Sequence, residues 1–100
     1  MSYEMLIGLQ VTDQTSYQAY REGMIPILKT YGGGFRYDFT VEKVLKTEST
    51  HPINRLFAIY FKDSSAKDAF FANEDYKKVR ATYFEPAVAG VTVISEYPMT

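Results

Sequence analysis

The chain has 100 residues, 46% of them apolar and 16% aromatic, so it is long and apolar enough for one folded domain over residues 1–100. Its formal net charge is −1, with acidic and basic residues interspersed, which argues against nucleic acid and anionic membranes as partners. The absence of cysteine excludes disulfides, thiolate catalysis and cysteine zinc sites. No apolar run approaches the ~20 residues that span a bilayer, and the N-terminus lacks the features of a signal peptide, so we expect a cytoplasmic protein.

The first third of the chain predicts a strand followed by a helix. Residues 3–11 alternate between apolar and mixed positions, as in a central strand with both faces at least partly covered. The helix is indicated by apolar residues that recur three or four positions apart and share one face: Tyr17, Tyr20, Met24, Ile27, Leu28 and Tyr31. Polar residues fall mostly on the other face: Gln18, Arg21, Glu22 and Lys29.

Both ends of this helix carry cap signals. Asp13 is a possible N-cap, and Thr15 with Gln18 forms a competing capping box, so two starts remain open. Pro26 should kink the helix without breaking it, because the apolar stripe crosses Pro26 in phase. The glycines at 32–34 should end the helix, with at least one of them in a left-handed conformation.

The next segment alternates strictly and predicts a second strand. Apolar residues share one face and polar residues the other: Phe35, Tyr37, Phe39 and Val41 against Arg36, Asp38, Thr40 and Glu42. Val44 breaks this parity, which predicts a β-bulge near Glu42–Lys43. A polar loop over residues 46–54 leads into residues 55–61, an apolar run typical of a strand buried on both faces.

The last third of the chain predicts two short helices and a final strand. Ser65 with Asp68 forms a plausible capping box for the first helix. Asn73 should cap the second helix, which should kink or end near Phe84. Residues 91–97 form the predicted last strand.

The order strand–helix–strand–strand–helix–strand is typical of a ferredoxin-like α+β domain, in which an antiparallel sheet carries its helices on one face. The first and third strands are nevertheless apolar on both sides, so the face opposite the helices needs a cover. A second copy of the same sheet is the simplest cover. We therefore expect a homodimer that forms through the open sheet face.

Taken together, these segments resemble the domain of unknown function 1330 family over nearly the whole chain. The resemblance is carried by Thr12–Asp13, Tyr17, Tyr20, Pro26, Tyr31–Gly33, Arg55–Phe61, Ala66, Ala69, Phe70 and Asp75–Tyr76. It implies a dimeric α/β-barrel fold, in a superfamily that also holds cofactor-free monooxygenases and haem-degrading enzymes. One position departs from the family pattern, because Lys46–Thr47 stands about where many members carry Glu-Gly near the end of the second strand.

Two arginines on apolar faces are the leading candidates for a ligand site. Arg55 begins the third strand in phase with its apolar residues. Its guanidinium either lies at the sheet edge in a structural role or binds a substrate carboxylate or enolate through two parallel hydrogen bonds. Arg80 lies on the apolar face of the last helix, where it either forms a salt bridge to a carboxylate such as Asp38 or contacts a ligand.

Four further residues complete the candidate set. Arg36 and Asp38 share a strand face and either pair across strands or contact a ligand. Tyr60 and Tyr83 either satisfy structural hydrogen bonds or relay a proton. His51, the single histidine, lies in a polar loop without an evident partner and is interpreted as solvated, and no spacing of His, Asp and Glu predicts a metal site.

Two functions fit this pattern. By resemblance, the first is a cofactor-free enzyme, monooxygenase- or isomerase-like, that acts on a small aromatic or enolisable substrate between sheet and helices. Arg55 and Arg80 would then stabilise developing negative charge on oxygen, and Tyr60 or Tyr83 would relay a proton. The second is a non-catalytic small-molecule binding or dimerisation module, whose polar residues only close the pocket or the interface.

Overall fold

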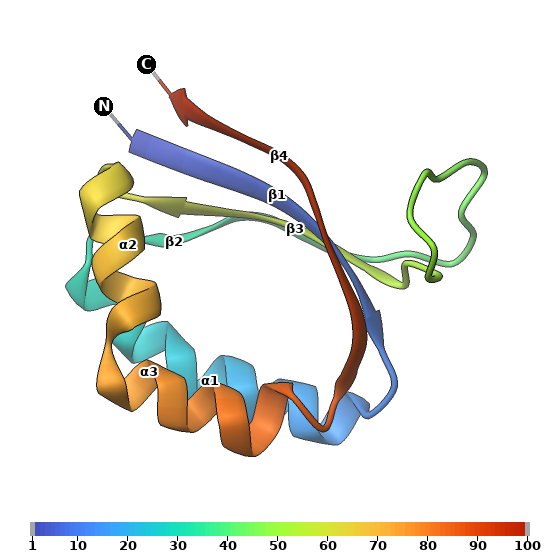
Figure 1. The fold of residues 1–100 in the computed structure, drawn as a ribbon, viewed down its shortest axis with the longest axis horizontal. Helices are drawn as coiled ribbons and strands as arrows, with labels where there is room; N and C mark the ends of the chain where they lie inside the picture. Colours follow the sequence, from blue (N-terminus) through green and yellow to red (C-terminus); the bar gives the residue numbers. More distant parts are fainter. Residues whose placement is uncertain (1, 100) are drawn as a thin grey trace.

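A computed structural model describes residues 2–99. In chain order its elements are β1 (Ser2–Val11), α1 (Gln14–Thr30), β2 (Gly34–Thr40), β3 (Arg55–Phe61), α2 (Ser64–Ala72), α3 (Glu74–Val79), a π-helical turn η1 (Arg80–Phe84) and β4 (Val88–Met99). The strands form one antiparallel four-stranded sheet in the order β2-β3-β1-β4, with the helices on one face (Figure 1). The predicted ferredoxin-like α+β fold is confirmed. The third strand coincides with its predicted range, whereas β4 is longer at both ends than residues 91–97.

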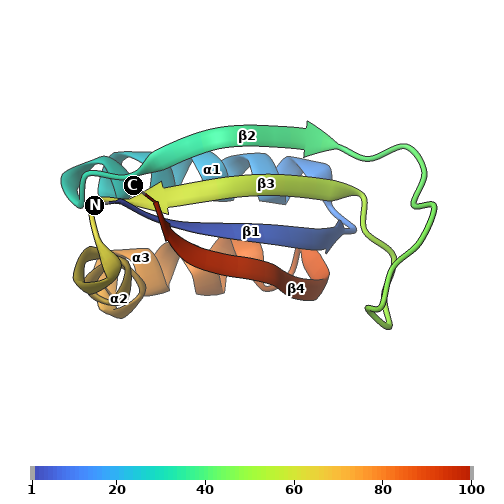
Figure 2. The ribbon, with the colours of Figure 1, turned by 90° about the horizontal axis from the view of Figure 1, so that it is seen from above.

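The curved sheet arches over the helical layer (Figure 1). Seen from above the sheet, α1 runs beneath its β2–β3 half, and α2 and α3 lie beneath its β1–β4 half (Figure 2). The layer between sheet and helices holds the buried hydrophobic core: Met5, Ile7, Leu9, Val11, Tyr17, Tyr20, Met24, Leu28, Phe57, Ile59, Phe61, Phe70, Tyr76, Phe84 and Ala87.

Short polar side chains set the helix starts. Asp13 is the N-cap of α1, one of the two predicted starts, and its carboxylate accepts a hydrogen bond of 3.0 Å from a first-turn N–H. The start of α2 differs from the predicted box at Ser65, because the Asp63 carboxylate accepts from the N–H of Ala66 at 2.7 Å. Asn73 caps α3, as predicted.

The end of α1 follows its glycines. The helix runs through Pro26 and ends in a Schellman pattern, because the N–H of Gly32 donates to the carbonyl of Lys29 and the N–H of Gly33 donates to that of Leu28. Gly32 has a φ of 70°, the left-handed conformation that the sequence predicts for one of the glycines.

The bulge in β2 lies earlier than predicted. Phe35 is opposite Ile59 and Tyr37 is opposite Ala58, so β2 has one extra residue between these two pairs. The predicted bulge at Glu42–Lys43 is wrong, because β2 has already ended there.

This early bulge inverts the faces of β2. Phe35 packs toward the helices, with its ring 5.5 Å from that of Phe57. Tyr37 and Phe39 then face away from the helices and are 54% and 51% exposed. Asp38, between them, turns into the sheet–helix layer. The predicted faces of β2 are therefore wrong beyond Phe35, and a carboxylate enters the interior.

The loop over residues 41–54 folds against one end of the opposite, open sheet face. Ile53 covers Gly8, where an added Cβ would lie 2.8 Å from its Cδ1 atom. The ring of His51 lies against Gly90, where an added Cβ would lie 2.4 Å from the ring. Two strand glycines therefore make room for this loop.

Candidate functional site

A cavity of about 250 Å³ lies between the sheet and the helices. It is lined by Met5, Ile7, Leu9, Tyr17, Tyr20, Met24, Phe35, Phe57, Ile59, Phe70, Phe71, Tyr76, Arg80, Phe84, Val91 and Val93. Most of these residues are buried, but Phe71, Val91 and Val93 are 36%, 48% and 45% exposed. The cavity therefore opens at the free edge of β4, beside α2. Apolar walls with a few polar groups are typical of small-molecule pockets.

Aromatic rings of the helices form one wall of the cavity. The ring centroid of Tyr20 lies 4.8 Å from that of Phe84, 5.8 Å from that of Tyr17 and 6.2 Å from that of Tyr76. These tilted and edge-on arrangements are the favourable geometries for aromatic pairs. The helical stripe predicted from the sequence thus gives the cavity a wall of rings that carry hydroxyl groups.

The tyrosine hydroxyls of this wall are neutral hydrogen-bond donors. Burial raises the pKa of Tyr17 to about 12, although the nearby Arg55 guanidinium opposes the shift. Burial also raises the pKa of Tyr20 well above its ordinary value and raises that of Tyr76. The hydroxyls of Tyr20 and Tyr76 lie 3.0 Å apart and share a hydrogen bond. At neutral pH these phenols are protonated and cannot act as bases. Since one of the Tyr20 and Tyr76 hydroxyls donates to the other, only one O–H of that pair is free to donate to a ligand oxygen.

Arg80 brings positive charge to the cavity. It lies at the start of η1, and its side chain is 43% exposed. The guanidinium lies 5.0 Å from the ring centroid of Phe84, and its Nη1 atom lies 3.2 Å from the carboxylate of Glu85. Because Glu85 is 59% exposed, water screens this ion pair and the pair contributes little to stability. Among the described residues that line the cavity, there is no carboxylate and no histidine.

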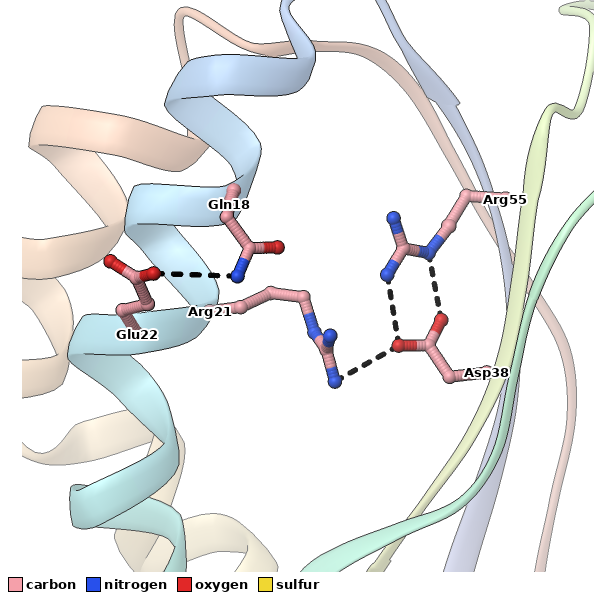
Figure 3. Close-up of polar contacts among 5 residues, drawn as sticks. All are labelled: Gln18, Arg21, Glu22, Asp38 and Arg55. Atoms are coloured by element: carbon pink, nitrogen blue, oxygen red, sulfur yellow. Dashed lines mark hydrogen bonds and ion pairs between the residues drawn. The ribbon is translucent and has the colours of Figure 1, made fainter.

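A second charged group lies on the inner face of the sheet, next to the cavity (Figure 3). Arg55 donates from Nε and Nη2 to the two carboxylate oxygens of Asp38, at 2.7 and 2.9 Å. Arg21, from α1, places Nη2 2.9 Å from the same carboxylate. We call Arg21, Asp38 and Arg55 the arginine cluster. The hydrogen bonds from Arg55 to Asp38 raise the pKa of Arg55. The arginine cluster also connects α1 to β2 and β3.

The arginine cluster touches the cavity wall through two aromatic rings. The Arg21 guanidinium lies 4.8 Å from the ring centroid of Phe35, and the Arg55 guanidinium lies 5.0 Å from that of Tyr17. Both rings also line the cavity. The cluster therefore lies behind this part of the wall, held by cation–π contacts.

The open sheet face has its own polar network. Glu4, whose side chain is only 3% exposed, accepts a hydrogen bond of 2.6 Å from Nε of Arg36. Its other carboxylate oxygen accepts from the Tyr97 hydroxyl. The Tyr60 ring lies on the same face, close to Gly34. This network faces away from the cavity.

The six predicted site residues therefore lie in different parts of the molecule. Asp38 and Arg55 are in the arginine cluster, Arg80 lines the cavity, Arg36 and Tyr60 lie on the open face, and Tyr83 is an exposed residue of η1. Arg80 does form a salt bridge to a carboxylate, one of its two expected roles, but the partner is Glu85 and not Asp38. The structure brings Asp38 to Arg55 instead.

Sequence reasoning missed several residues of these groups. Tyr17 and Tyr20 were expected only in the hydrophobic stripe, and Tyr76 was not among the candidate site residues, although all three line the cavity. Arg21 was placed on the polar face of α1, yet its long side chain reaches Asp38. Glu4 offered only one signal, a lone acid within an apolar strand.

Other forms of chemistry find little support in residues 2–99. His51 places Nδ1 2.7 Å from the carbonyl oxygen of Pro52 and Nε2 2.7 Å from the Thr92 hydroxyl, so it fastens the loop to β4. Within this range no group of three or more His, Cys, Asp or Glu could hold a metal ion. None of the described helices is long and apolar enough to cross a membrane. A hollow of about 500 Å³ between the loop and β4 lies on the outer surface, where Lys46, Glu48 and Ile94 line it.

Comparisons with known proteins identify a family and a fold. A family model for a domain of unknown function (DUF1330) matches residues 3–97. No protein of curated function matches the sequence.

Three similar solved structures come from bacteria. A protein of unknown function from Rhodopseudomonas palustris is 15% identical with a TM-score of 0.80, over 99% of this chain and 82% of that one. A DABB family protein with a ferredoxin-like fold from Mesorhizobium loti is 12% identical with a TM-score of 0.68, over 99% and 97%. A candidate antibiotic biosynthesis monooxygenase from Nitrosomonas europaea is 13% identical with a TM-score of 0.59, over 98% and 89%. At these identities the likeness shows the fold alone.

Proposed function

This chain belongs to the DUF1330 family, and we propose that it binds a small aromatic or enolisable compound in the cavity between its sheet and its helices. The lining of that cavity carries the proposal. Its walls are apolar and aromatic, its three tyrosines are neutral phenols of which one O–H is used in the Tyr20–Tyr76 hydrogen bond, and Arg80 supplies positive charge. A ligand with one ring and one anionic or enolic oxygen satisfies all three features.

The size of the cavity limits the ligand. Its volume of about 250 Å³ lies below the range of about 300–1,000 Å³ typical of pockets for drug-sized molecules. A compound with a single ring suits this space better than a flavin or a haem. The apolar part would contact the rings of the helical wall, and the oxygen would point toward Arg80 and the tyrosines.

An enzymatic form of this proposal is cofactor-free oxygenation or isomerisation of the bound compound. Arg80 and the neutral phenols would stabilise an enolate or phenolate, which is the reactive form in such chemistry. The described lining residues offer no carboxylate or histidine to remove a proton. The substrate would therefore have to be acidic enough to ionise near neutral pH, as many phenols with electron-withdrawing groups and 1,3-dicarbonyl compounds are. The fold that the chain shares with a candidate monooxygenase agrees with this form.

A thermal-shift screen tests the proposal with aromatic acids, acidic phenols and 1,3-dicarbonyl compounds. A ligand at 100 times its dissociation constant stabilises by about 2.7 kcal/mol, which raises Tm by about 10–20 °C in a domain of this size. The variant Val93→Trp should block the mouth of the cavity and abolish the shift. Leu45→Trp is the control, because Leu45 is 88% exposed in the loop and does not line the cavity. Arg80→Gln should weaken anionic ligands selectively.

The outcomes of this screen are distinct. A hit that Val93→Trp removes and Leu45→Trp retains supports the cavity. Oxygen consumption with such a ligand would support the enzyme, and binding without turnover would support the non-catalytic module. A complete absence of shifts, or hits that Val93→Trp leaves unchanged, would contradict the proposal.

We also propose that the chain forms a homodimer through its open sheet face. The support is a group of large apolar side chains on this side of the sheet and along β4, which are 36–54% exposed: Tyr37, Phe39, Ile94 and Tyr97. Sedimentation should give a dimer at micromolar concentration, and Phe39→Lys should give a monomer. Leu45→Lys is the control, because Leu45 is 88% exposed in the loop. A wild-type monomer would contradict this proposal.

A further inference from the structure

The arginine cluster carries more positive than negative charge. Two guanidiniums, of Arg21 and Arg55, face a single carboxylate, that of Asp38. The group therefore has a net charge of about +1 at neutral pH, since arginine stays protonated. The side chains are only 20%, 14% and 17% exposed, so water screens this excess charge poorly.

Most hydrogen-bond donors of the cluster are not used by Asp38. A guanidinium carries five N–H donors in a fixed plane. Arg55 uses Nε and Nη2 on Asp38, and Arg21 uses Nη2. The Nε atom of Arg21 is buried and has no hydrogen-bond partner among the described residues. A buried donor without an acceptor costs about 1–3 kcal/mol, so such a group usually has a partner or a role.

The geometry of the cluster favours a monoanion. Asp38 holds Arg55 through a two-bonded fork and holds Arg21 by a further contact, so both guanidiniums are positioned before any ligand arrives (Figure 3). The rings of Phe35 and Tyr17 support them from the cavity side. One added carboxylate would bring the net charge of the cluster to zero, whereas a phosphate dianion would make it negative.

We propose that Arg21 and Arg55 form a binding site for a carboxylate group, with Asp38 as the residue that positions them. The site is separate from the cavity lining, so it does not depend on the ligand proposed there. The three side chains keep 14–20% of their exposure, and a small carboxylate would reach the guanidiniums through this exposed part. A free carboxylate and the carboxylate of a larger molecule would bind through the same contacts.

The test is an NMR titration of the arginine Nε–H signals of the whole protein with sodium acetate, at constant ionic strength against sodium chloride. The signals of Arg21 and Arg55 should shift and saturate. Arg36, whose side chain is 47% exposed on the open face, is the internal control, and its Nε–H signal should not show this saturable shift. Arg21→Gln should raise the dissociation constant for acetate, measured at Arg55, by about tenfold or more, the value of one charge-assisted hydrogen bond.

Further variants keep the test decisive. If Arg21→Gln does not fold, Arg21→Lys keeps the charge but removes the Nε donor and should still weaken acetate. The cavity variant Val93→Trp should leave acetate binding unchanged, which separates this site from the proposed cavity ligand. The proposed site would be contradicted if the shifts increased linearly with acetate concentration without saturation. It would also be contradicted if sodium chloride produced the same shifts, or if the Arg36 signal shifted in the same way. Saturation by inorganic phosphate but not by acetate would overturn its assignment to carboxylates.

Discussion

Asp38 offers the sharpest test of how the interior is held together. Its carboxylate accepts contacts of 2.7 and 2.9 Å from Arg55 and one of 2.9 Å from Arg21. The substitution Asp38→Asn keeps the shape of the side chain and one acceptor oxygen. It removes the negative charge that both guanidiniums face, so two like charges would remain close together in a poorly solvated layer.

The magnitude follows from the burial of these groups. Removal of one partner of a fully buried ion pair costs about 3–5 kcal/mol. The three side chains retain 14–20% of their exposure, so water and small shifts recover part of that loss. We therefore expect Asp38→Asn to lower the free energy of unfolding by about 2–3 kcal/mol. In a domain of this size Tm should fall by about 10–20 °C.

Urea denaturation of the variant and of a matched control measures this loss. Asp68→Asn is the control, because the Asp68 side chain is 76% exposed and pairs with Lys67 at 3.4 Å. A pair this exposed should contribute less than about 1 kcal/mol. If Asp38→Asn destabilised the protein no more than Asp68→Asn, the arginine cluster would not be a structural tie and this reasoning would be refuted.

Three further predictions concern single groups. In the folded protein Tyr17 should ionise near pH 12. Because this pKa is raised above that of the unfolded chain, the stabilisation by neutral Tyr17 should be complete below pH 10 and should fall by about 2 kcal/mol by about pH 12. Tyr17→Phe should remove this contribution to the decline. Tyr20→Phe and Tyr76→Phe should each cost about 1–2 kcal/mol, and a double mutant with additive losses would contradict their shared hydrogen bond. Gly32→Ala should cost about 1–2 kcal/mol, because φ is 70° and an added Cβ would lie 3.0 Å from Lys62 Cβ; an unchanged urea midpoint would contradict this.

The order and type of the elements were predictable because their signals are local. Residues 55–61 form a strand with the predicted ends, since an apolar run between turn residues fixes both limits. Asn73 caps α3, and Gly32 ends α1, for reasons of side-chain and backbone chemistry that act within one turn. The start of α2 differs from the prediction because Asp63 outcompetes the Ser65 box, and β4 extends beyond its predicted ends.

The faces of β2 were not predictable, because the pairing partner decides them. Phe35, Tyr37 and Phe39 alternate perfectly in the sequence, and nothing in that pattern marks an extra residue. The bulge next to Phe35 sends Tyr37 outward and turns Asp38 inward. A shift of one residue inverts every later side chain of a strand, so one local change moved a charge from one side of the sheet to the other.

The candidate site was predictable only in part. Arg55 and Arg80 drew attention because charges on apolar faces are unusual, and the structure places each of them at an organised group. The buried tyrosines did not, because a helical aromatic stripe predicts a core whether or not a cavity lies beside it. A cavity depends on how the sheet and the helices fail to fill the space between them, which no single segment encodes.

The most direct test of the central claim is a backbone amide NMR map of the protein titrated with 4-nitrophenol, a one-ring acidic phenol that carries no carboxylate. We expect saturable shifts along the cavity, in α1, in η1 and in the part of β4 near Val93. These shifts should disappear in Val93→Trp and weaken in Arg80→Gln. Shifts confined to the open sheet face or to the arginine cluster, or none at millimolar 4-nitrophenol, would contradict the claim that the cavity is a ligand site.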